Sequence, residues 1–152
     1  MLLSRPRQTA WQGWRRPVLR VSFALSILSS AAFADESYGT WLTVDRDSRI
    51  KLTRCGSNLC GNLIWLSEPN NDDGSPKRDV YNPDVALRGR LVMGIQILLG
   101  LAPEGDHWSG KIYDPEDGKT YQATFRMIDA KRAELQGCAA VIFCEKQIWT
   151  KD

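Results

Sequence analysis

A regular alternation of apolar and polar residues from Lys119 to Met127 is the feature that most limits how this chain can fold. Tyr121, Ala123 and Phe125 point to the same side as Met127, and the residues between them are polar. Side chains along a β-strand point to opposite faces with a period of two, so one face of this segment is buried and the other is wet. The segment is therefore predicted to be a half-buried antiparallel strand.

The preceding segment, Asp106 to Asp114, alternates in the same way. The sequence PEDG lies between the two segments and is a strong turn signal, so they are predicted to form a hairpin. The same reasoning predicts eight strands: Tyr38–Val44, Arg49–Arg54, Leu59–Leu66, Leu91–Leu98, Asp106–Asp114, Lys119–Ile128, Arg132–Gly137 and Phe143–Lys151. Eight sequential strands with short turns predict an all-β fold, an antiparallel up-and-down barrel whose closure removes exposed edges.

One long polar loop interrupts this pattern after Leu66. Its first part, residues 67–82, is rich in Asn, Asp, Pro and Gly. Asn82 can cap a helix, Pro83 fits the first helical position, and Gly89 marks an end. The loop is therefore predicted to carry one short helix.

The first 34 residues resemble an export signal. Five arginines and no acidic residue precede a short apolar core at Val21–Leu28, and Ala32-Phe33-Ala34 fits a cleavage site. An uncleaved anchor or a structured helix is the alternative, but the apolar run is short for a bilayer core of about 30 Å. The prediction is a signal peptide at 1–34, one domain at 35–152, and a periplasmic or secreted protein without a stable membrane anchor. Either the general secretory or the twin-arginine route remains open.

Removal of the leader changes the charge of the chain. The leader carries five of the 20 basic residues and none of the 18 acidic ones, which leaves 15 basic and 18 acidic residues in the domain. Lys and Arg are scattered singly along it, whereas nucleic-acid binding usually needs a concentrated basic face. A nucleic-acid partner is therefore not expected.

Four cysteines occur in two local pairs, in CGSNLCG and in CAAVIFC. In an oxidising compartment they are expected to form disulfides, Cys55 with Cys60 and Cys138 with Cys144, each within a hairpin. A zinc cluster is the alternative, but these spacings fit the usual ligand motifs poorly. A redox site would need a C-x-x-C motif, which is absent.

Several motifs in order along the chain carry a resemblance to a known family. CGSNLCGNLIWL, NPDVALRGR, GLAPEGDHWSGKIYDPEDGKTY and QIWTK resemble the bacterial secreted family called domain of unknown function 2147. This resemblance implies a lipocalin-like or calycin-like barrel and no established enzymatic activity. Gly39-Thr40-Trp41 also resembles the GxW motif of lipocalins, in which the Trp plugs the closed end of the barrel near a basic residue. Lys151 is the expected basic partner.

The sequence contains few groups suited to catalysis. His107 is the only histidine, and neither a nucleophile elbow nor a phosphate-binding glycine motif is present. The acidic loops PNNDDGS and DPEDGKT fail the calcium-loop pattern at its first and last ligand positions. We expect a protein without enzymatic activity, metal or cofactor.

Aromatic residues are the better indication of function. The interior of an eight-stranded barrel can be filled by side chains or can hold one small ligand. If a cavity exists, the loop from Ser67 to Arg90 is expected to gate it, with Arg88 and Arg90 near an anionic head group of the ligand. The alternative for these two arginines is a surface salt bridge to Asp84 or another carboxylate. The residues predicted to contact a ligand are Trp41, Trp65, Arg88, Trp108, Tyr121 and Phe125.

Two functions follow from these patterns. The first is a carrier or sensor that binds a small apolar or amphipathic ligand inside the barrel. The second is an envelope protein-interaction module with a filled barrel, whose working surface is formed by NPDVALRGR and DPEDGKTY. A void of about 300 Å³ or more in the barrel would favour the first function.

Overall fold

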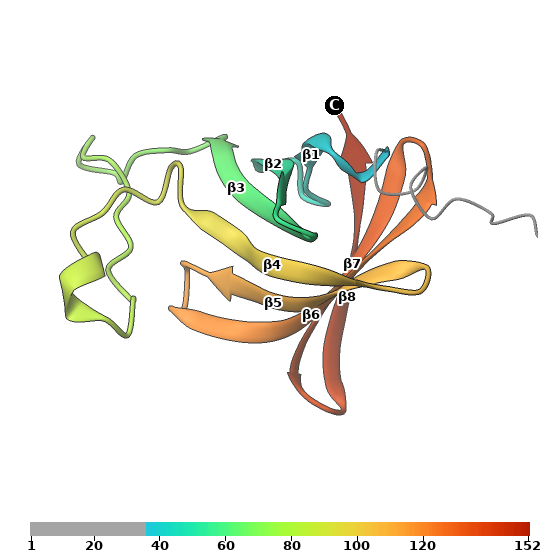
Figure 1. Ribbon diagram of the computed structural model, residues 1–152. Helices are drawn as coiled ribbons and strands as arrows, with labels where there is room; N and C mark the ends of the chain where they lie inside the picture. The colour runs from blue at the N-terminus through green and yellow to red at the C-terminus, as the bar shows by residue number, and fades with distance from the viewer. Residues whose placement is uncertain (1–35) are drawn as a thin grey trace, which may run out of the picture.

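Eight antiparallel strands close into one barrel in the computed structural model, which describes residues 36–152 (Figure 1). The strands are β1 (Gly39–Leu42), β2 (Ser48–Cys55), β3 (Asn58–Leu66), β4 (Gln96–Glu104), β5 (His107–Asp114), β6 (Lys119–Asp129), β7 (Arg132–Ala140) and β8 (Phe143–Lys151). Each strand pairs with the next, and β1 pairs with β8. The predicted all-β, up-and-down barrel is confirmed. The signal peptide predicted for residues 1–34 lies outside the described residues.

The alternation that predicted the β5–β6 hairpin agrees with the observed pairing. Trp108 pairs with Phe125 and Ile112 pairs with Tyr121, so the apolar positions of the two strands share the inner face. Phe125 is fully buried and Ala123 nearly so, whereas the intervening residues are more exposed. The period-two pattern therefore identified both the hairpin and its inward side.

The prediction for the fourth strand, Leu91–Leu98, was wrong at both ends. β4 begins at Gln96 and continues to Glu104, beyond Leu98, where the strand was predicted to end. Gly100 has a φ of +71° and lies where the β4–β5 register shifts, so it forms a bulge within the strand instead of a turn after it. Val92 and Ile95 are buried, but they lie in the loop before β4. The apolar character of these residues therefore did not show that they belong to a strand.

One end of the barrel is closed by the short segment that precedes β1. Trp41 Nε1 on β1 donates to the carbonyl of Ser37 at 2.9 Å, and Trp108 Nε1 on β5 donates to Ser37 Oγ at 3.3 Å. Lys151 Nζ on β8 donates to the carbonyl of Glu36 at 2.6 Å and lies 5.6 Å from the Trp41 ring centroid. The expected arrangement of a plugging tryptophan beside Lys151 is therefore present.

An aromatic cluster fills the interior next to this closed end. The rings of Trp41 and Phe125 meet edge to face with centroids 5.6 Å apart, and Phe125 meets Trp149 at 6.2 Å. All three side chains are almost completely buried. Edge-to-face aromatic pairs are favourable, and such large rings account for much of the buried apolar area. The largest buried side chains of the core are therefore among those packed at this end of the barrel.

Two disulfides staple two hairpins. Cys138 pairs with Cys144 across β7 and β8, with Cα atoms 4.0 Å apart. Cys55 bonds to Cys60 with Cα atoms 5.8 Å apart, but the two residues are not opposite each other as expected, because Cys55 pairs in register with Asn58. Both predicted disulfides are present. The disulfide of the β2–β3 hairpin joins two residues that are not register partners.

The long loop of residues 67–95 connects β3 to β4 and contains two isolated bridges, Asn70 with Pro76 and Arg78 with Leu91. Its helix is a single 3₁₀ turn at Val85–Leu87, labelled η1. Asp84, not Asn82, caps this turn by accepting a hydrogen bond from Ala86 N. Within residues 36–152, no helix is long and apolar enough to cross a membrane.

Candidate functional site

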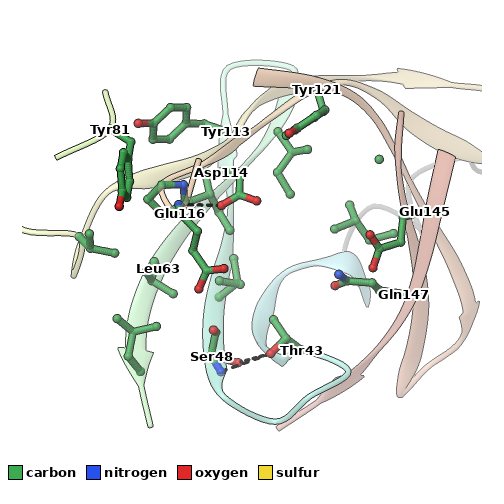
Figure 2. Close-up of a pocket in the computed structure, with 18 of the residues that line it drawn as sticks. Thr43, Ser48, Leu63, Tyr81, Tyr113, Asp114, Glu116, Tyr121, Glu145 and Gln147 are labelled. Carbon is green, nitrogen blue, oxygen red and sulfur yellow. Dashed lines mark hydrogen bonds between the residues drawn. The ribbon is translucent and has the colours of Figure 1, made fainter. Parts of the chain in front are cut away.

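A cavity of about 1040 Å³ occupies the barrel at the end opposite the Trp41 plug (Figure 2). The apolar residues that line its inner part include Ile50, Leu63, Leu66, Val92, Ile97, Ile112, Leu135 and Trp149. Most of these side chains are buried, so a ligand in the cavity would rest on an apolar floor. This volume matches that of typical small-molecule pockets.

The inner face becomes polar toward the mouth of the cavity. On β8, Trp149, Gln147 and Glu145 follow one another at alternate positions and all line the cavity. On β5, Ile112 is followed at the next inward position by Asp114. The period of two that buries Trp149 and Ile112 therefore also directs these carboxylates into the cavity.

Three carboxylates line the mouth of the cavity: Asp114, Glu116 and Glu145. In Figure 2, Asp114 and Glu116 lie on one wall, and Glu145 and Gln147 lie on the other. None of the three carboxylates forms an ion pair with any of residues 36–152. Thr43, Ser48 and Tyr121 add hydroxyl groups to the lining.

The environment of Asp114 is unfavourable for negative charge. Partial burial raises the pKa of Asp114, and the nearby charges of Asp117 and Glu145 raise it further. The backbone N–H of Glu116 donates to Asp114 Oδ1 at 2.8 Å and opposes this shift without cancelling it. The carboxylates of Asp117 and Glu145 therefore give the surroundings of Asp114 a local negative potential.

The long loop forms part of the rim of the cavity. Its residues Asn71, Ser75–Arg78, Val80 and Tyr81 line the mouth. Two of them are basic: Lys77, and Arg78, whose guanidinium donates to the carbonyl of Gly89. The β7–β8 turn contributes Ile142 and Phe143, which are 80% and 69% exposed.

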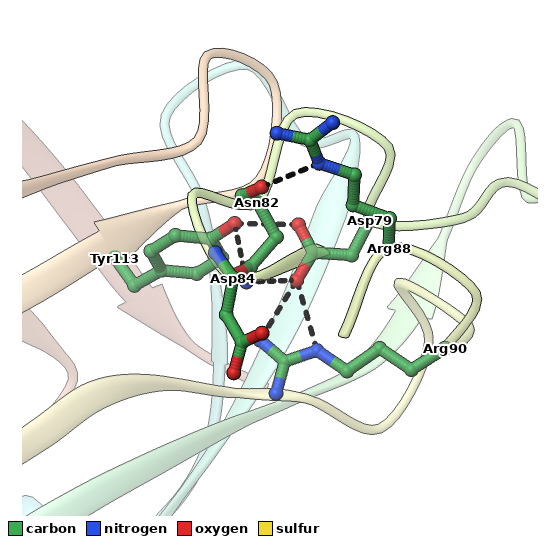
Figure 3. Close-up of polar contacts among 6 residues, drawn as sticks. All are labelled: Asp79, Asn82, Asp84, Arg88, Arg90 and Tyr113. Carbon is green, nitrogen blue, oxygen red and sulfur yellow. Dashed lines mark hydrogen bonds and ion pairs between the residues drawn. The ribbon is translucent and has the colours of Figure 1, made fainter. Parts of the chain in front are cut away.

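A buried polar cluster between the long loop and Tyr113 of β5, which also borders the cavity, fixes this loop to the barrel (Figure 3). Asp79 has no exposed surface and accepts hydrogen bonds from Tyr113 OH at 2.5 Å and Asn82 Nδ2 at 2.7 Å. Arg90 approaches the same carboxylate with Nε and Nη2, each at 2.8 Å. We call Asp79, Asn82, Arg90 and Tyr113 the loop latch.

The loop latch also explains two shifted pKa values. Burial by itself would raise the pKa of Asp79, but hydrogen bonds from Tyr113, Asn82 and Arg90 outweigh it and hold the pKa below its usual range. Burial, together with the hydrogen bond to Asp79 and its negative charge, raises the pKa of Tyr113 to about 12. Both shifts favour a charged Asp79 beside a neutral Tyr113.

The residues predicted to contact a ligand occupy several different places. Tyr121 lines the cavity. Trp41, Trp108 and Phe125 belong to the buried core, and none of the three is a lining residue. Whether any of them contacts a ligand stays a prediction, but the structure places Trp149 in the cavity wall, a tryptophan that sequence reasoning did not select.

Trp65 and Arg88, the other two predicted contacts, lie away from the cavity lining. The Trp65 ring packs beneath the guanidinium of Arg49, whose Cζ is 4.3 Å from the ring centroid. Arg88 Nε donates to the carbonyl of Asn82 at 2.8 Å. Arg90 is held by Asp79, so neither arginine expected at the mouth is available there.

His107, the only histidine of the sequence, lies away from the cavity lining. It contacts Asp106 and Glu104 near the β4–β5 turn. Among residues 36–152, no group of three or more His, Cys, Asp and Glu side chains is arranged to hold a metal ion.

Residues 39–151 match the family described as "Uncharacterized protein conserved in bacteria (DUF2147)". No curated protein matches the chain in sequence. Among solved structures, the chain is similar to the one titled "Protein HP1028 from the human pathogen Helicobacter pylori belongs to the lipocalin family". The identity is 22%, the TM-score is 0.64, and the match covers 76% of this chain and 82% of that chain, which shows a shared fold. The chain therefore belongs to the bacterial DUF2147 family and has a lipocalin-like barrel.

Proposed function

We propose that this protein is an exported, non-enzymatic carrier or sensor that binds a small apolar or amphipathic molecule inside its barrel. The observation that carries the proposal is the cavity of about 1040 Å³ with an apolar floor. Contact between water and the aliphatic walls of such a cavity is unfavourable. A ligand with an apolar part would remove this contact, and that gain in free energy would favour binding. The filled barrel required by the alternative interaction module does not agree with this cavity.

Export is supported by two further features. Both disulfides join neighbouring residues in hairpins, and such bonds persist mainly in oxidising compartments such as the bacterial periplasm. The family is bacterial, and the leader of the sequence resembles a signal peptide. We therefore place the protein in the periplasm or outside the cell.

The proposal is tested with N-phenyl-1-naphthylamine, a neutral dye that fluoresces in apolar surroundings. The wild-type barrel should bind it saturably, with a change in tryptophan emission because Trp149 lines the cavity. Gly137→Phe should abolish binding, since Gly137 lines the cavity and its added side chain would project inward. Gln136→Phe is the matched control, because Gln136 is the neighbouring residue of β7 and is not in the lining.

If the dye does not bind to a folded wild-type protein, or if Gly137→Phe binds it as well as Gln136→Phe does, the cavity is not the binding site. Native mass spectrometry of protein taken directly from the periplasm provides an independent test. The expected result is an adduct that disappears in the Gly137→Phe variant.

A further inference from the structure

We propose that the cavity selects amphipathic ligands whose head group is cationic, such as a long-chain alkylammonium, and that Asp114 and Glu145 receive that head group. The inference rests on the proposed function, because it requires a ligand within the barrel. It reverses the expectation of an anionic head group, which depended on arginines at the mouth. The site is the cavity itself, and the two carboxylates determine which molecules it accepts.

The positions of the two carboxylates on opposite walls support this assignment. Asp114 is the inward residue that follows Ile112 on β5, and Glu145 is the last inward carboxylate above Trp149 on β8. Figure 2 shows both side chains directed into the space between the walls. A ligand whose chain lies on the apolar floor would therefore carry its head group between them.

The basic residues beside these carboxylates are engaged elsewhere. Lys119, the register partner of Asp114, lies 3.7 Å from the carboxylate of Asp117. Lys146, which follows Glu145, points to the other face of β8 and pairs with Glu134 at 3.1 Å. The strands thus provide carboxylates to the cavity without providing the cations that would neutralise them.

The loop adds two positive charges, Lys77 and Arg78, to the lining of the mouth. Arg78 is directed to the carbonyl of Gly89, and Lys77 borders both the cavity and a smaller acidic depression formed by Glu68, Asp72 and Asp73. Lys77 therefore lies between two groups of carboxylates. The raised pKa of Asp114, caused by burial and then by Asp117 and Glu145, agrees with a mouth where a cation would be stabilised.

The inference is tested with three probes that share a ten-carbon chain: decylamine, decanol and decanoate. Their affinities are measured by displacement of N-phenyl-1-naphthylamine at about pH 7, where decylamine is protonated. Because hydrogen bonds to charged groups are stronger than neutral ones, decylamine should bind about tenfold more tightly than decanol. Decanoate should bind more weakly than decanol, and added salt should reduce the preference for the amine.

The variant Asp114→Asn/Glu145→Gln should remove the preference for decylamine and leave the affinity for decanol unchanged. Glu104→Gln is the matched control, because it removes one negative charge at the β4–β5 turn, outside the cavity lining. The side chain of Glu104 is 69% exposed, so this substitution should preserve the fold and the preference.

Each outcome separates this inference from the proposed function. If decanol and decylamine bind equally well to the wild type, selection for cations is wrong and the carrier function stands. If decanoate binds most tightly and Lys77→Gln abolishes that binding, the head group is anionic and the inference is overturned. If none of the three probes displaces the dye and the dye itself does not bind, the proposed function fails, and this inference fails with it.

Discussion

Removal of a single hydroxyl group from the loop latch, by Tyr113→Phe, should destabilise the protein measurably. The hydroxyl of Tyr113 donates to the fully buried carboxylate of Asp79 at 2.5 Å. Asn82 and Arg90 still bind that carboxylate in the variant, and the aromatic ring remains, so no cavity and no unpaired charge are created. The variant loses one hydrogen bond to a charged acceptor and a weaker one that Tyr113 OH accepts from Asn82 Nδ2 at 3.0 Å. Because Asn82 Nδ2 still donates to Asp79, the combined loss is about 2 kcal/mol of the free energy of unfolding.

The assay is urea unfolding followed by tryptophan fluorescence, with thermal unfolding as a second measurement. For a domain of this length, about 2 kcal/mol corresponds to a decrease in Tm of about 8 °C. Tyr121→Phe is the matched control, since Tyr121 OH also donates to a carboxylate, that of Asp117. The side chain of Asp117 is 35% exposed, so water can replace this bond, and the decrease in Tm should be less than half as large.

The pH dependence of stability provides a second readout. The pKa of Asp79 is lowered in the folded state, so the stability that it contributes is present above its unfolded pKa and is lost as the pH falls. The pKa of Tyr113 is raised to about 12, so its contribution is complete below its unfolded pKa and is lost as the pH rises through about 12. Tyr113→Phe should weaken the acidic dependence and remove this part of the alkaline one. Equal effects of Tyr113→Phe and Tyr121→Phe on stability would refute the loop latch.

Three further predictions concern the glycine turn, the disulfide and the mouth of the cavity. Gly118→Ala should cost at least about 2 kcal/mol in urea unfolding, because φ is +70° and the new Cβ would lie 1.9 Å from the carbonyl oxygen of Tyr81; Gly74→Ala, at φ +80° with nothing within 4 Å, should show only the smaller conformational cost. Reduction of the β7–β8 disulfide should lower the free energy of unfolding by about 2 kcal/mol, as loop closure predicts for so short a ring, and far-ultraviolet circular dichroism should still show the barrel. Asp114→Asn should raise stability at neutral pH by about 0.5 kcal/mol, because the raised pKa means that the charged form is disfavoured by folding; a lower Tm would contradict this.

The strand pattern could be predicted because it depends on local alternation, and the errors arose where local pattern and tertiary register differ. Trp65 and Trp108 both lie in apolar strand segments, yet only Trp108 points into the core. The register of β2 and β3 shifts between Arg49 and Ile50, which places Trp65 opposite Arg49 and away from the cavity lining. A bulge of this kind reverses the facing of every residue beyond it, and a single sequence does not mark its position.

Tyr113 illustrates a second limit of sequence reasoning. The alternation of residues along β5 does not predict that Tyr113 is buried, because the loop residues that cover it come from residues 67–95. In the sequence, Asp79 was one polar residue of the long loop among many, and Asn82 was expected to cap a helix. Their pairing with Tyr113 depends on how the loop folds back on the barrel, for which no local pattern exists. Arg90 was expected either at the mouth or in an ion pair with a carboxylate, and the structure shows the ion pair.

The mouth of the cavity, in contrast, follows from the same alternation that predicted the core. When the period of two is continued from Ile112 it reaches Asp114, and when it is continued backward from Trp149 it reaches Glu145. A half-buried carboxylate without a cation reduces folding stability, and a fold that needed only a core would gain by replacing it. This cost in stability is offset if the charge of Asp114 binds the head group of a ligand. An increase in stability for Asp114→Asn together with a loss of affinity for decylamine would therefore show that the same charge lowers stability and determines selectivity. An increase in stability without any change in affinity would mean that the charge of Asp114 has no part in binding.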